Sequence, residues 1–439
     1  MDALKSCSIA RADFRGWQAA YLANGLIRVT AVPDIGGRLM AYDLGDYAYL
    51  FVDRDLAGKL FSAAENQGDG TLAAWKNYGG AKTWPAPQGW DGPDQWPGPP
   101  DAILDTGRYH LAELTSTGAE ARLRMVSPAG SPTGVQITRE ARIAAGTSRL
   151  NLRLTFANIA ERPVRWSIWD VAQLRADRLG SNGRLTYEPG CVVTAPANPR
   201  SRFPAGYNVM FGAPDNPQWC VDRDQGLFVG TYRFEIGKVG LDSRGGWIAF
   251  ANTATGYAFI ERFAAEPDGV YPDAGADVEC WTVGRGQVAT LSYDETSGPF
   301  LMETEVLSPF RDIAPAATAS FDIEWSACRC AGPILAVTAG GCVTRHLSVA
   351  LSDGQATLTG TFGVFDAGWL ELIWLDGDPE GTHGSGAALA NEPLAPVTPL
   401  ALLQLDHRAA VPARAASLRL DVVTPDGQRR ELATARLRG

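Results

Sequence analysis

The chain has 439 residues, of which 45% are hydrophobic and 20% are charged, and acidic residues outnumber basic ones by 49 to 39. This is the composition of a globular rather than a disordered protein, and its length predicts two domains. The formal net charge of −10 and the lack of a basic run argue against a nucleic-acid partner, because neutralising phosphates requires clustered lysines and arginines.

The first thirteen residues contain no apolar run long enough for a signal peptide, and no later run approaches the roughly 20 apolar residues that cross a bilayer. Seven scattered cysteines do not form a disulfide pattern, and no pair of Cys or His has zinc-ligand spacing. We therefore expect a cytoplasmic protein without cofactor, metal or membrane partner, unless a native leader has been removed. A cleft with several carboxylates could still hold Ca²⁺.

Short runs rich in β-branched and aromatic residues, bounded by turn residues, predict strands along most of the chain. Their spacing favours a sandwich or barrel, with one short helix within Ser62 to Trp75. The strands predicted before residue 330 are Leu26–Val32, Gly134–Arg139, Leu150–Phe156, Arg165–Trp169, Gly226–Tyr232, Gly246–Ala251, Tyr257–Phe263, Asp277–Val283, Val288–Tyr293, Phe300–Leu307 and Ala319–Trp325.

The segment from Asn77 to Pro100 is crowded with Gly, Pro and Trp and is predicted to be a loop. A long loop inside a compact domain is usually functional or disordered, and its tryptophans argue against disorder. We therefore expect it to line a site.

A domain boundary is expected between Ala331 and Gly341, which divides the chain into a main region, 1–330, and a smaller β-sandwich, 331–439. The second region is either a structural or oligomerisation element or a carbohydrate-binding module, and the oligomeric state is not predicted. Residues 376–396 are expected to be a loop. The predicted strands are Leu347–Leu351, Ala356–Phe362, Trp369–Leu375, Leu400–Leu405, Leu418–Val423 and Arg430–Ala435.

Several segments of the main region resemble aldose 1-epimerases and their relatives. Residues 24–39, which end in Gly36-Gly37-Arg38-Leu39, resemble the opening strands of that family. Residues 78–85 resemble the Gly-Gly…Trp-Pro segment of the hexose-6-phosphate mutarotase branch, one residue shorter. The segment from Asn158 to Trp169 resembles the strand pair that leads to the catalytic histidine of these enzymes, and Phe300–Glu305 the strand that supplies their catalytic glutamate.

The chain most resembles an uncharacterised bacterial branch of this galactose-mutarotase-like superfamily. The blocks that it shares with that branch are Asn77–Gln88, Trp169–Gln173, Lys238–Ser243 and Glu303–Pro309. The resemblance covers about residues 15–326 and implies a mainly β fold, a β-supersandwich with a sugar cleft. It is weak evidence for the reaction, because one fold hosts many chemistries.

The sequence departs from the family at the catalytic histidine, where it has Trp169, Asp170 and Val171. His110 is the only histidine of the main region, and we expect an ordinary strand residue. Sugar anomerisation needs a base and an acid. The resemblance makes Glu303 the base. We expect Asp170 to replace the histidine as acid, or to bind sugar hydroxyls with Gln173.

Further residues are expected to bind the substrate. Glu305 shares a strand face with Glu303, and the two carboxyls would shift each other's pKa. Lysines and arginines near a cleft would suit an anionic sugar, and tryptophans offer flat apolar platforms to sugar rings. The expected substrate-binding residues are Arg38, Asn77, Lys82, Trp84, Gln88, Trp90, Trp96, Gln173, Lys238 and Glu305.

The sequence leaves the function open between classes, and does not decide whether the protein is an enzyme. One hypothesis is a mutarotase or epimerase with a replaced acid. A variant is a glycoside hydrolase or polysaccharide lyase, because paired carboxylates also serve glycoside cleavage. The other is a sugar-binding protein without catalysis. In each case the partner is a mono- or oligosaccharide.

Overall fold

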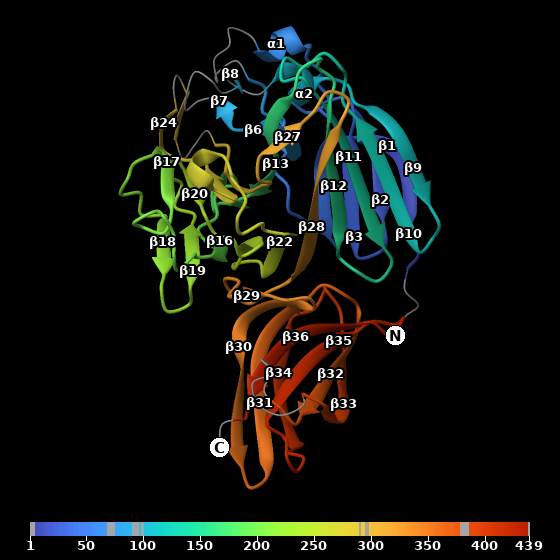
Figure 1. Ribbon diagram of the computed structural model, residues 1–439, viewed down its shortest axis with the longest axis vertical. Helices are drawn as coiled ribbons and strands as arrows, with labels where there is room; N and C mark the ends of the chain where they lie inside the picture. The colour runs from blue at the N-terminus through green and yellow to red at the C-terminus, as the bar shows by residue number, and fades with distance from the viewer. Residues whose placement is uncertain are drawn as a thin grey trace.

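The computed structural model describes residues 5–67, 75–89, 96–97, 101–288, 291–294, 298–377 and 386–437. In these residues the chain is built mostly from antiparallel β-sheets (Figure 1), which confirms the mainly β prediction. The described helices are the short α1 (Ala63–Gln67), α2 (Ala102–Thr106) and the 3₁₀ turn η1 (Asp273–Gly275). None of them is long and apolar enough to span a membrane. The helix α1 lies within the predicted segment, whose residues 68–74 are outside the described part.

One large sheet brings together strands that are distant in the sequence. Its central strands are paired in the order β4, β6, β13, β26, β23 and β20. We call it the site sheet. It contains β1 (Ser8–Phe14), β2 (Trp17–Ala23), β3 (Ile27–Val32), β4 (Arg38–Leu44), β5 (Tyr47–Ala48), β6 (Ala81–Ala86), β13 (Val164–Arg175), β17 (Asn208–Gly212), β20 (Gly237–Leu241), β23 (Val278–Thr282), β26 (Leu301–Leu307) and β27 (Arg311–Ile313).

A second large sheet packs against the first across an apolar core that includes Val29, Leu154 and Phe259. In β11 and β12 buried apolar residues alternate with polar ones, as expected when one face of a strand meets the core. We call it the back sheet. It contains β9 (His110–Ser116), β10 (Glu120–Val126), β11 (Val135–Ala144), β12 (Leu150–Asn158), β16 (Cys191–Pro196), β18 (Trp219–Asp222), β19 (Leu227–Thr231), β21 (Trp247–Asn252), β22 (Tyr257–Phe263) and β28 (Thr318–Arg329).

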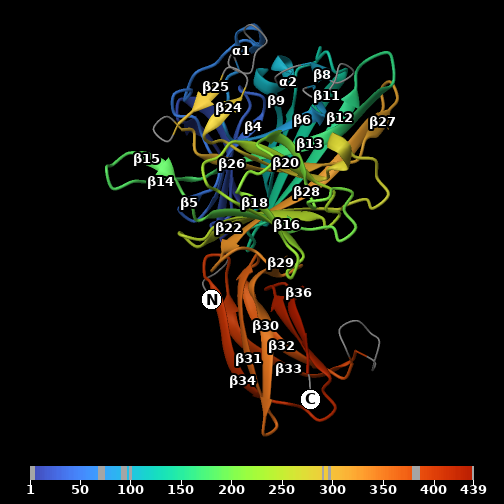
Figure 2. The same cartoon turned by 90° about the vertical axis from the view of Figure 1, so that its left-hand side faces the viewer.

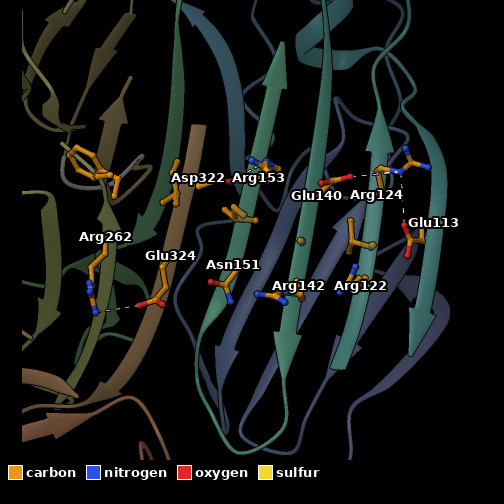
Figure 3. Close-up of a pocket in the computed structure, with 16 residues that line it drawn as sticks. Glu113, Arg122, Arg124, Glu140, Arg142, Asn151, Arg153, Arg262, Asp322 and Glu324 are labelled. Atoms are coloured by element: carbon orange, nitrogen blue, oxygen red, sulfur yellow. Dashed lines mark ion pairs between the residues drawn. The ribbon is translucent and has the colours of Figure 1, made fainter. Parts of the chain in front are cut away.

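The outward side chains of the back sheet line a groove of about 780 Å³, with arginines and carboxylates facing each other across neighbouring strands (Figure 3). Short two-stranded pairs complete the main region. They are β7 (Gln88–Gly89) with β8 (Trp96–Pro97), β14 (Asp177–Leu179) with β15 (Leu185–Tyr187), and β24 (Gly286–Val288) with β25 (Leu291–Tyr293).

The structure corrects several predicted boundaries. The strand predicted for Val288–Tyr293 is part of the β24–β25 pair, and the predicted loop 376–396 contains most of β33 (Ala388–Val397). The strand predicted to end at Trp169 continues to Arg175, because β13 pairs with both β6 and β26 along this stretch. Residues 170–173 therefore belong to a central strand.

The segment predicted as a loop also contains a strand, β6, which includes Pro85. A proline removes a backbone donor and is normally excluded from the middle of a sheet. The pairing explains the exception. On one side β6 pairs with β13 over its whole length, but on the other it meets β4 only where Ala81 faces Leu39. At Pro85 the strand is an edge on that second side, so the missing donor costs no ladder bond.

Two glycines carry the chain into β6. Gly79 and Gly80 have φ values of +90° and +71°, a conformation that L side chains rarely adopt. A Cβ at Gly79 would lie 2.3 Å from the Phe51 carbonyl oxygen, and one at Gly80 would lie 2.5 Å from that of Leu39. The glycine pair therefore permits the close approach that sets the position of Lys82 and Trp84.

The C-terminal strands form two four-stranded sheets around a separate apolar core. In the described residues they share no strand with the two large sheets, which supports the proposed division near residue 330. The strands are β29 (Ala336–Val337), β30 (Gly341–Ser352), β31 (Gln355–Val364), β32 (Gly368–Leu375), β33, β34 (Leu403–Ala410), β35 (Ser417–Val423) and β36 (Arg429–Arg436).

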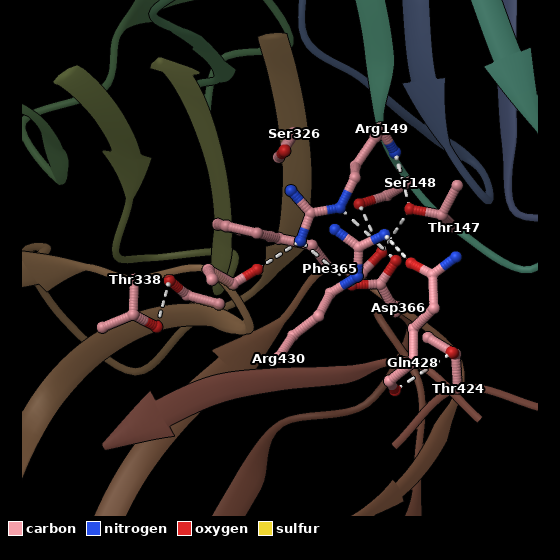
Figure 4. Close-up of polar contacts among 12 residues, drawn as sticks. Thr147, Ser148, Arg149, Ser326, Thr338, Phe365, Asp366, Thr424, Gln428 and Arg430 are labelled. Carbon is pink, nitrogen blue, oxygen red and sulfur yellow. Dashed lines mark hydrogen bonds and ion pairs between the residues drawn. The ribbon is translucent and has the colours of Figure 1, made fainter. Parts of the chain in front are cut away.

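This C-terminal region is docked below the sandwich in both views (Figure 1 and Figure 2). Arg149, which directly precedes β12, lies at the centre of the contact (Figure 4), where its Nη2 donates to Asp366 Oδ2 at 3.0 Å. It also pairs with Glu324 of β28, and Arg430 Nε lies 3.4 Å from the same Asp366 oxygen. An apolar cluster that includes Trp247 and Phe365 covers the remaining contact. Such paired and apolar contacts hold the two regions together.

Candidate functional site

The outward face of the site sheet carries polar and aromatic side chains in cross-strand rows. Residues directly opposite each other in a sheet share a face, and so do residues two apart in one strand. The first row is Gln173, Glu303, Trp281 and Lys238, the second is Lys82, Val171, Glu305 and Glu279, and the third is Trp84, Trp169 and Leu307.

A cavity of about 310 Å³ lies over these rows. This volume is at the lower end of the range for small-molecule sites. It is lined by Asp53, Leu56, Trp75, Lys76, Asn77, Lys82, Trp84, Gln88, Trp169, Gln173, Lys238, Trp281, Val283, Tyr293, Pro299 and Glu303.

Glu303 lies on the cavity floor and is 8% exposed. Gln173 Nε2 donates a hydrogen bond of 2.5 Å to its Oε1, and Lys82 Nζ is 3.5 Å from the same oxygen. Among the described residues these are its polar partners, so Oε2 is the oxygen that a ligand can reach. Gln173 and Lys82 therefore hold the Glu303 carboxylate in place through one of its two oxygens.

Lys82 lies between aromatic rings at the side of Glu303. Its Nζ is 4.3 Å from the centroid of the Trp84 ring and 4.9 Å from that of Trp75, which is cation–π geometry. Burial lowers the pKa of Lys82 below its ordinary value, against the raising effect of Glu303. The ammonium group is therefore less strongly stabilised than that of a solvated lysine.

Lys238 belongs to a tighter cluster beside the cavity. Its Nζ lies 2.7 Å from Glu279 Oε2 and 2.9 Å from Glu305 Oε2, and 4.5 Å from the Trp169 ring centroid. Trp169 Nε1 donates to the same Glu305 oxygen at 2.9 Å. Burial alone lowers the pKa of Lys238, but the two carboxylates outweigh it and raise the pKa. This ammonium group is held firmly in its charged form.

The two carboxyls of this cluster respond to the same burial. Desolvation raises the pKa of Glu279 to about 7, against the lowering effect of Lys238, and raises that of Glu305 well above its ordinary value. Because one lysine faces two buried acids, one acid can hold a proton near neutral pH. Glu305 is 0% exposed and does not line the cavity, although it was expected to bind substrate.

Arg38 has a different place from the one expected. It is buried, pairs with Asp105 and donates to the Gly79 carbonyl oxygen at 3.1 Å. Asp105 Oδ2 accepts the indole Nε1 proton of Trp75 at 2.7 Å. Arg38 thus does not line the cavity, and is connected to its wall residue Trp75 through Asp105.

Asp170 also lies elsewhere than expected. It is 0% exposed and points between the sheets, where its Oδ1 accepts from Thr83 at 2.8 Å and lies 3.5 Å from Arg139 Nη2 of β11. Burial raises its pKa, and Arg139 and Thr83 lower it. The reason is strand parity: position 170 faces the core when positions 169, 171 and 173 face outward.

The structure shows where the other residues expected at the site lie. Asn77, Lys82, Trp84, Gln88, Gln173, Lys238 and Glu303 line the cavity. Trp90 lies outside the described residues, and of Trp96 only the backbone, in β8, is described. His110 lies exposed in β9. Sequence reasoning missed Trp75, Trp169, Trp281, Tyr293 and Asp53. Parity would have found Trp169, which is two residues from Val171 and four from Gln173.

The larger back-sheet groove is a weaker candidate. Its charges neutralise each other across strands: Arg153 Nε lies 3.3 Å from Asp322, Arg262 Nη1 lies 3.6 Å from Glu324, and Arg124 Nε lies 4.0 Å from Glu140 (Figure 3). The side chains of Arg153 and Asp322 are largely solvated and those of the other two pairs are partly exposed, and exposed pairs contribute little energy. The groove is consistent with a solvated sheet face.

No protein-family model and no curated protein matches the chain. Solved structures do match. A candidate aldose 1-epimerase from Klebsiella pneumoniae subsp. pneumoniae superposes with a TM-score of 0.51 at 13% identity, over 74% of this chain and 85% of that one. A galactose mutarotase-like protein from Clostridium acetobutylicum aligns with a TM-score of 0.45 at 9% identity, over 74% of this chain and 99% of that one.

At such identities a likeness concerns the fold and not the reaction. The aligned share of 74% is similar in size to the main region. About three quarters of the chain therefore share the fold of that candidate aldose 1-epimerase, in agreement with the fold that the sequence motifs imply.

Proposed function

We propose that the cavity over the site sheet binds a sugar and that the protein interconverts the anomers of an aldose with Glu303 as general base. The observation that carries this proposal is the position of Glu303, a carboxylate on the floor of a small cavity, fixed through Oε1 with Oε2 available. A base must be within hydrogen-bond reach of the proton that it removes, and must be held there.

The rest of the lining suits a sugar. Trp75, Trp84, Trp169 and Trp281 offer apolar surface to the C–H groups of a pyranose ring. Asn77, Gln88 and Gln173 offer amide donors and acceptors for hydroxyls. The volume favours a monosaccharide over a polymer.

The charges favour a neutral sugar over an anionic one. The two buried lysines of the cavity already face carboxylates, Lys82 facing Glu303 and Lys238 facing Glu279 and Glu305. An anionic substituent would have to compete with those carboxylates in a desolvated site. Glycoside cleavage is also less well supported, because its second carboxylate was expected from Asp170 or Glu305, and neither lines the cavity.

The test compares wild type with Glu303→Gln, a nearly isosteric change that removes the base. Thermal shift and calorimetry against neutral aldoses and uronic acids identify ligands, and polarimetry or NMR exchange measures anomer interconversion of each ligand. We expect turnover of a neutral aldose by wild type and a loss of at least about 10²-fold in Glu303→Gln. Binding without turnover in both proteins would instead make this a sugar-recognition protein.

A further inference from the structure

A base alone does not open a pyranose ring. Removing the proton from the anomeric hydroxyl O1 pushes electrons onto the ring oxygen O5, which must receive a proton as the C1–O5 bond breaks. The site has no histidine among its described lining residues, and Asp170 faces the core. The donor must be another group that lines the cavity.

The described titratable groups of the lining, besides Glu303, are Asp53, Lys76, Lys82, Lys238 and Tyr293. Lys238 is unsuited, because two carboxylates hold its proton. Burial raises the pKa of Asp53, against the lowering effect of the backbone N–H groups of Asp55 and Leu56, but no contact in the described part of the chain joins Asp53 to Glu303. Tyr293 has its pKa raised by burial, so the phenol is a weaker acid than usual.

Lys82 differs from these groups because it faces the base directly. Its Nζ lies 3.5 Å from Glu303 Oε1, and its side chain is only 3% exposed. The two oxygens that exchange protons in the reaction, O1 and O5, are bonded to the same carbon. A donor and an acceptor that lie side by side on one floor can serve both oxygens at once.

Resting on the proposed function, we propose that Lys82 is the general acid of this site and donates an Nζ proton to the ring oxygen as Glu303 removes the proton of the anomeric hydroxyl. The O1–H and C1–O5 bonds break, and the C1=O1 double bond forms. The electron pair of C1–O5 takes the lysine proton. The products are the open-chain aldehyde, a neutral Glu303 acid and a neutral Lys82 amine.

Rotation about C1–C2 and the reverse steps then give the other anomer. The amine recovers its proton from the O5 hydroxyl, and Glu303 returns its proton to O1. No oxidant and no net proton is required. The site passes from a buried ion pair to a buried neutral pair and back, which costs less in a desolvated cavity than creating a new charge would. The lowered pKa of Lys82 acts in the same direction.

Two tryptophans of the cavity wall lie against the ammonium group of Lys82. Trp75 and Trp84 cover Nζ from two sides, so the ammonium group is stabilised partly by rings rather than by water. Arg38 and Asp105 hold Trp75 in place through its indole N–H. Arg38 is thus a positioning residue for the proton donor rather than a substrate ligand.

The test uses the aldose that wild type interconverts. Lys82→Met removes the proton and keeps a side chain of similar length, and Lys59→Met, at an exposed lysine outside the cavity, is the matched control. We expect kcat to fall about 10²–10⁴-fold in Lys82→Met with sugar affinity within about tenfold of wild type, and no change in Lys59→Met. A small primary amine added to Lys82→Ala should restore part of the turnover.

The pH profile separates a proton donor from a structural residue. In wild type kcat should fall at high pH as Lys82 loses its proton, and the residual activity of Lys82→Met should lack that limb. The assignment is overturned by kcat of Lys82→Met within threefold of wild type, by an unchanged limb, by a limb that disappears in Asp53→Asn instead, or by a loss that no amine restores.

If Lys82→Met does not fold, Lys82→Arg gives the same decision, because a guanidinium keeps the charge but does not release its proton. Turnover of that variant within threefold of wild type overturns the assignment. Failure of the proposed function looks different: wild type itself then interconverts no aldose, and both proposals fall together. Wild-type turnover that Glu303→Gln abolishes and Lys82→Met keeps overturns only the role of Lys82.

Discussion

The outward faces of the two large sheets are both charged and both hollowed, but they differ in how their charges are held. On the back sheet, arginines and carboxylates pair across strands in solvent around a groove of about 780 Å³. On the site sheet, two lysines and three glutamates are desolvated among tryptophans around a cavity of about 310 Å³. The larger hollow is therefore not the better candidate. Buried charges that line a cavity distinguish the site sheet from the back sheet, because desolvated groups have more strongly shifted pKa values and stronger fields than solvated ones.

The largest difference in stability between the two faces should appear when a buried lysine is replaced by a neutral residue. Lys238→Met leaves Glu279 and Glu305 buried without their counter-charge, and we expect the free energy of unfolding at pH 8 to fall by about 3–5 kcal/mol. At pH 5 the loss should be smaller, since the carboxyls can then be protonated. Urea titration at both pH values measures it, with Lys59→Met as control. An equal loss at the two pH values would contradict the buried-cluster interpretation.

The second largest expected effect is the pH dependence of wild-type stability. Burial raises the pKa of Glu279 from its ordinary 4.5 to about 7, so the folded state binds more protons than the unfolded state between these values. The stability that the protonated Glu279 carboxyl contributes is complete below pH 4.5 and is lost as the pH rises through 7. The total loss of stability over this range is on the order of 3 kcal/mol, because each unit of pKa shift corresponds to about 1.4 kcal/mol.

Glu279→Gln tests this slope, because glutamine occupies the same position without titrating. Urea titrations between pH 4.5 and 8 should give a flatter profile for the variant than for wild type. A profile as steep as that of wild type would assign the slope to another group.

A smaller effect is expected at the cavity floor. Gln173→Leu removes the donor that orients Glu303 while keeping the side-chain volume. A hydrogen bond to a charged group is worth about 1.5–3 kcal/mol, and we expect a loss of stability of that order together with weaker sugar binding. Calorimetry and urea titration measure the two effects. Unchanged affinity would remove Gln173 from the binding site.

The smallest effect belongs to the back-sheet groove. The side chains of Arg153 and Asp322 are 58% and 67% exposed, so their pairing should contribute about 0.2–1 kcal/mol and should weaken with salt. A double-mutant cycle of Arg153→Ala and Asp322→Ala measures it. A coupling energy above about 2 kcal/mol, or loss of sugar binding in either variant, would contradict the difference that we draw between the two faces.

Strand alternation in the sequence was sufficient for the class of fold, and the motif blocks of the family resemblance supplied much of the candidate site. Glu303, Lys82, Trp84 and Gln173 were expected from motif blocks, and all of them line the cavity. Asp170 was misplaced because the strand was predicted to end at Trp169. If the predicted strand had been extended beyond Trp169, the alternation of side chains would have predicted that Asp170 faces the core.

The amino-acid sequence by itself determined which residues share a face of each strand, since side chains alternate along an extended backbone whatever surrounds it. Only the tertiary structure decided which strands became neighbours. It placed β6 and β26 on the two sides of β13, which put Lys82 near Glu303, and it placed β23 beside β26, which put Glu279 opposite Glu305. No local pattern encodes those contacts, because they join segments more than 200 residues apart or from strands that pair out of sequence order. The pKa shifts that give the site its chemistry arise from these long-range contacts and from burial.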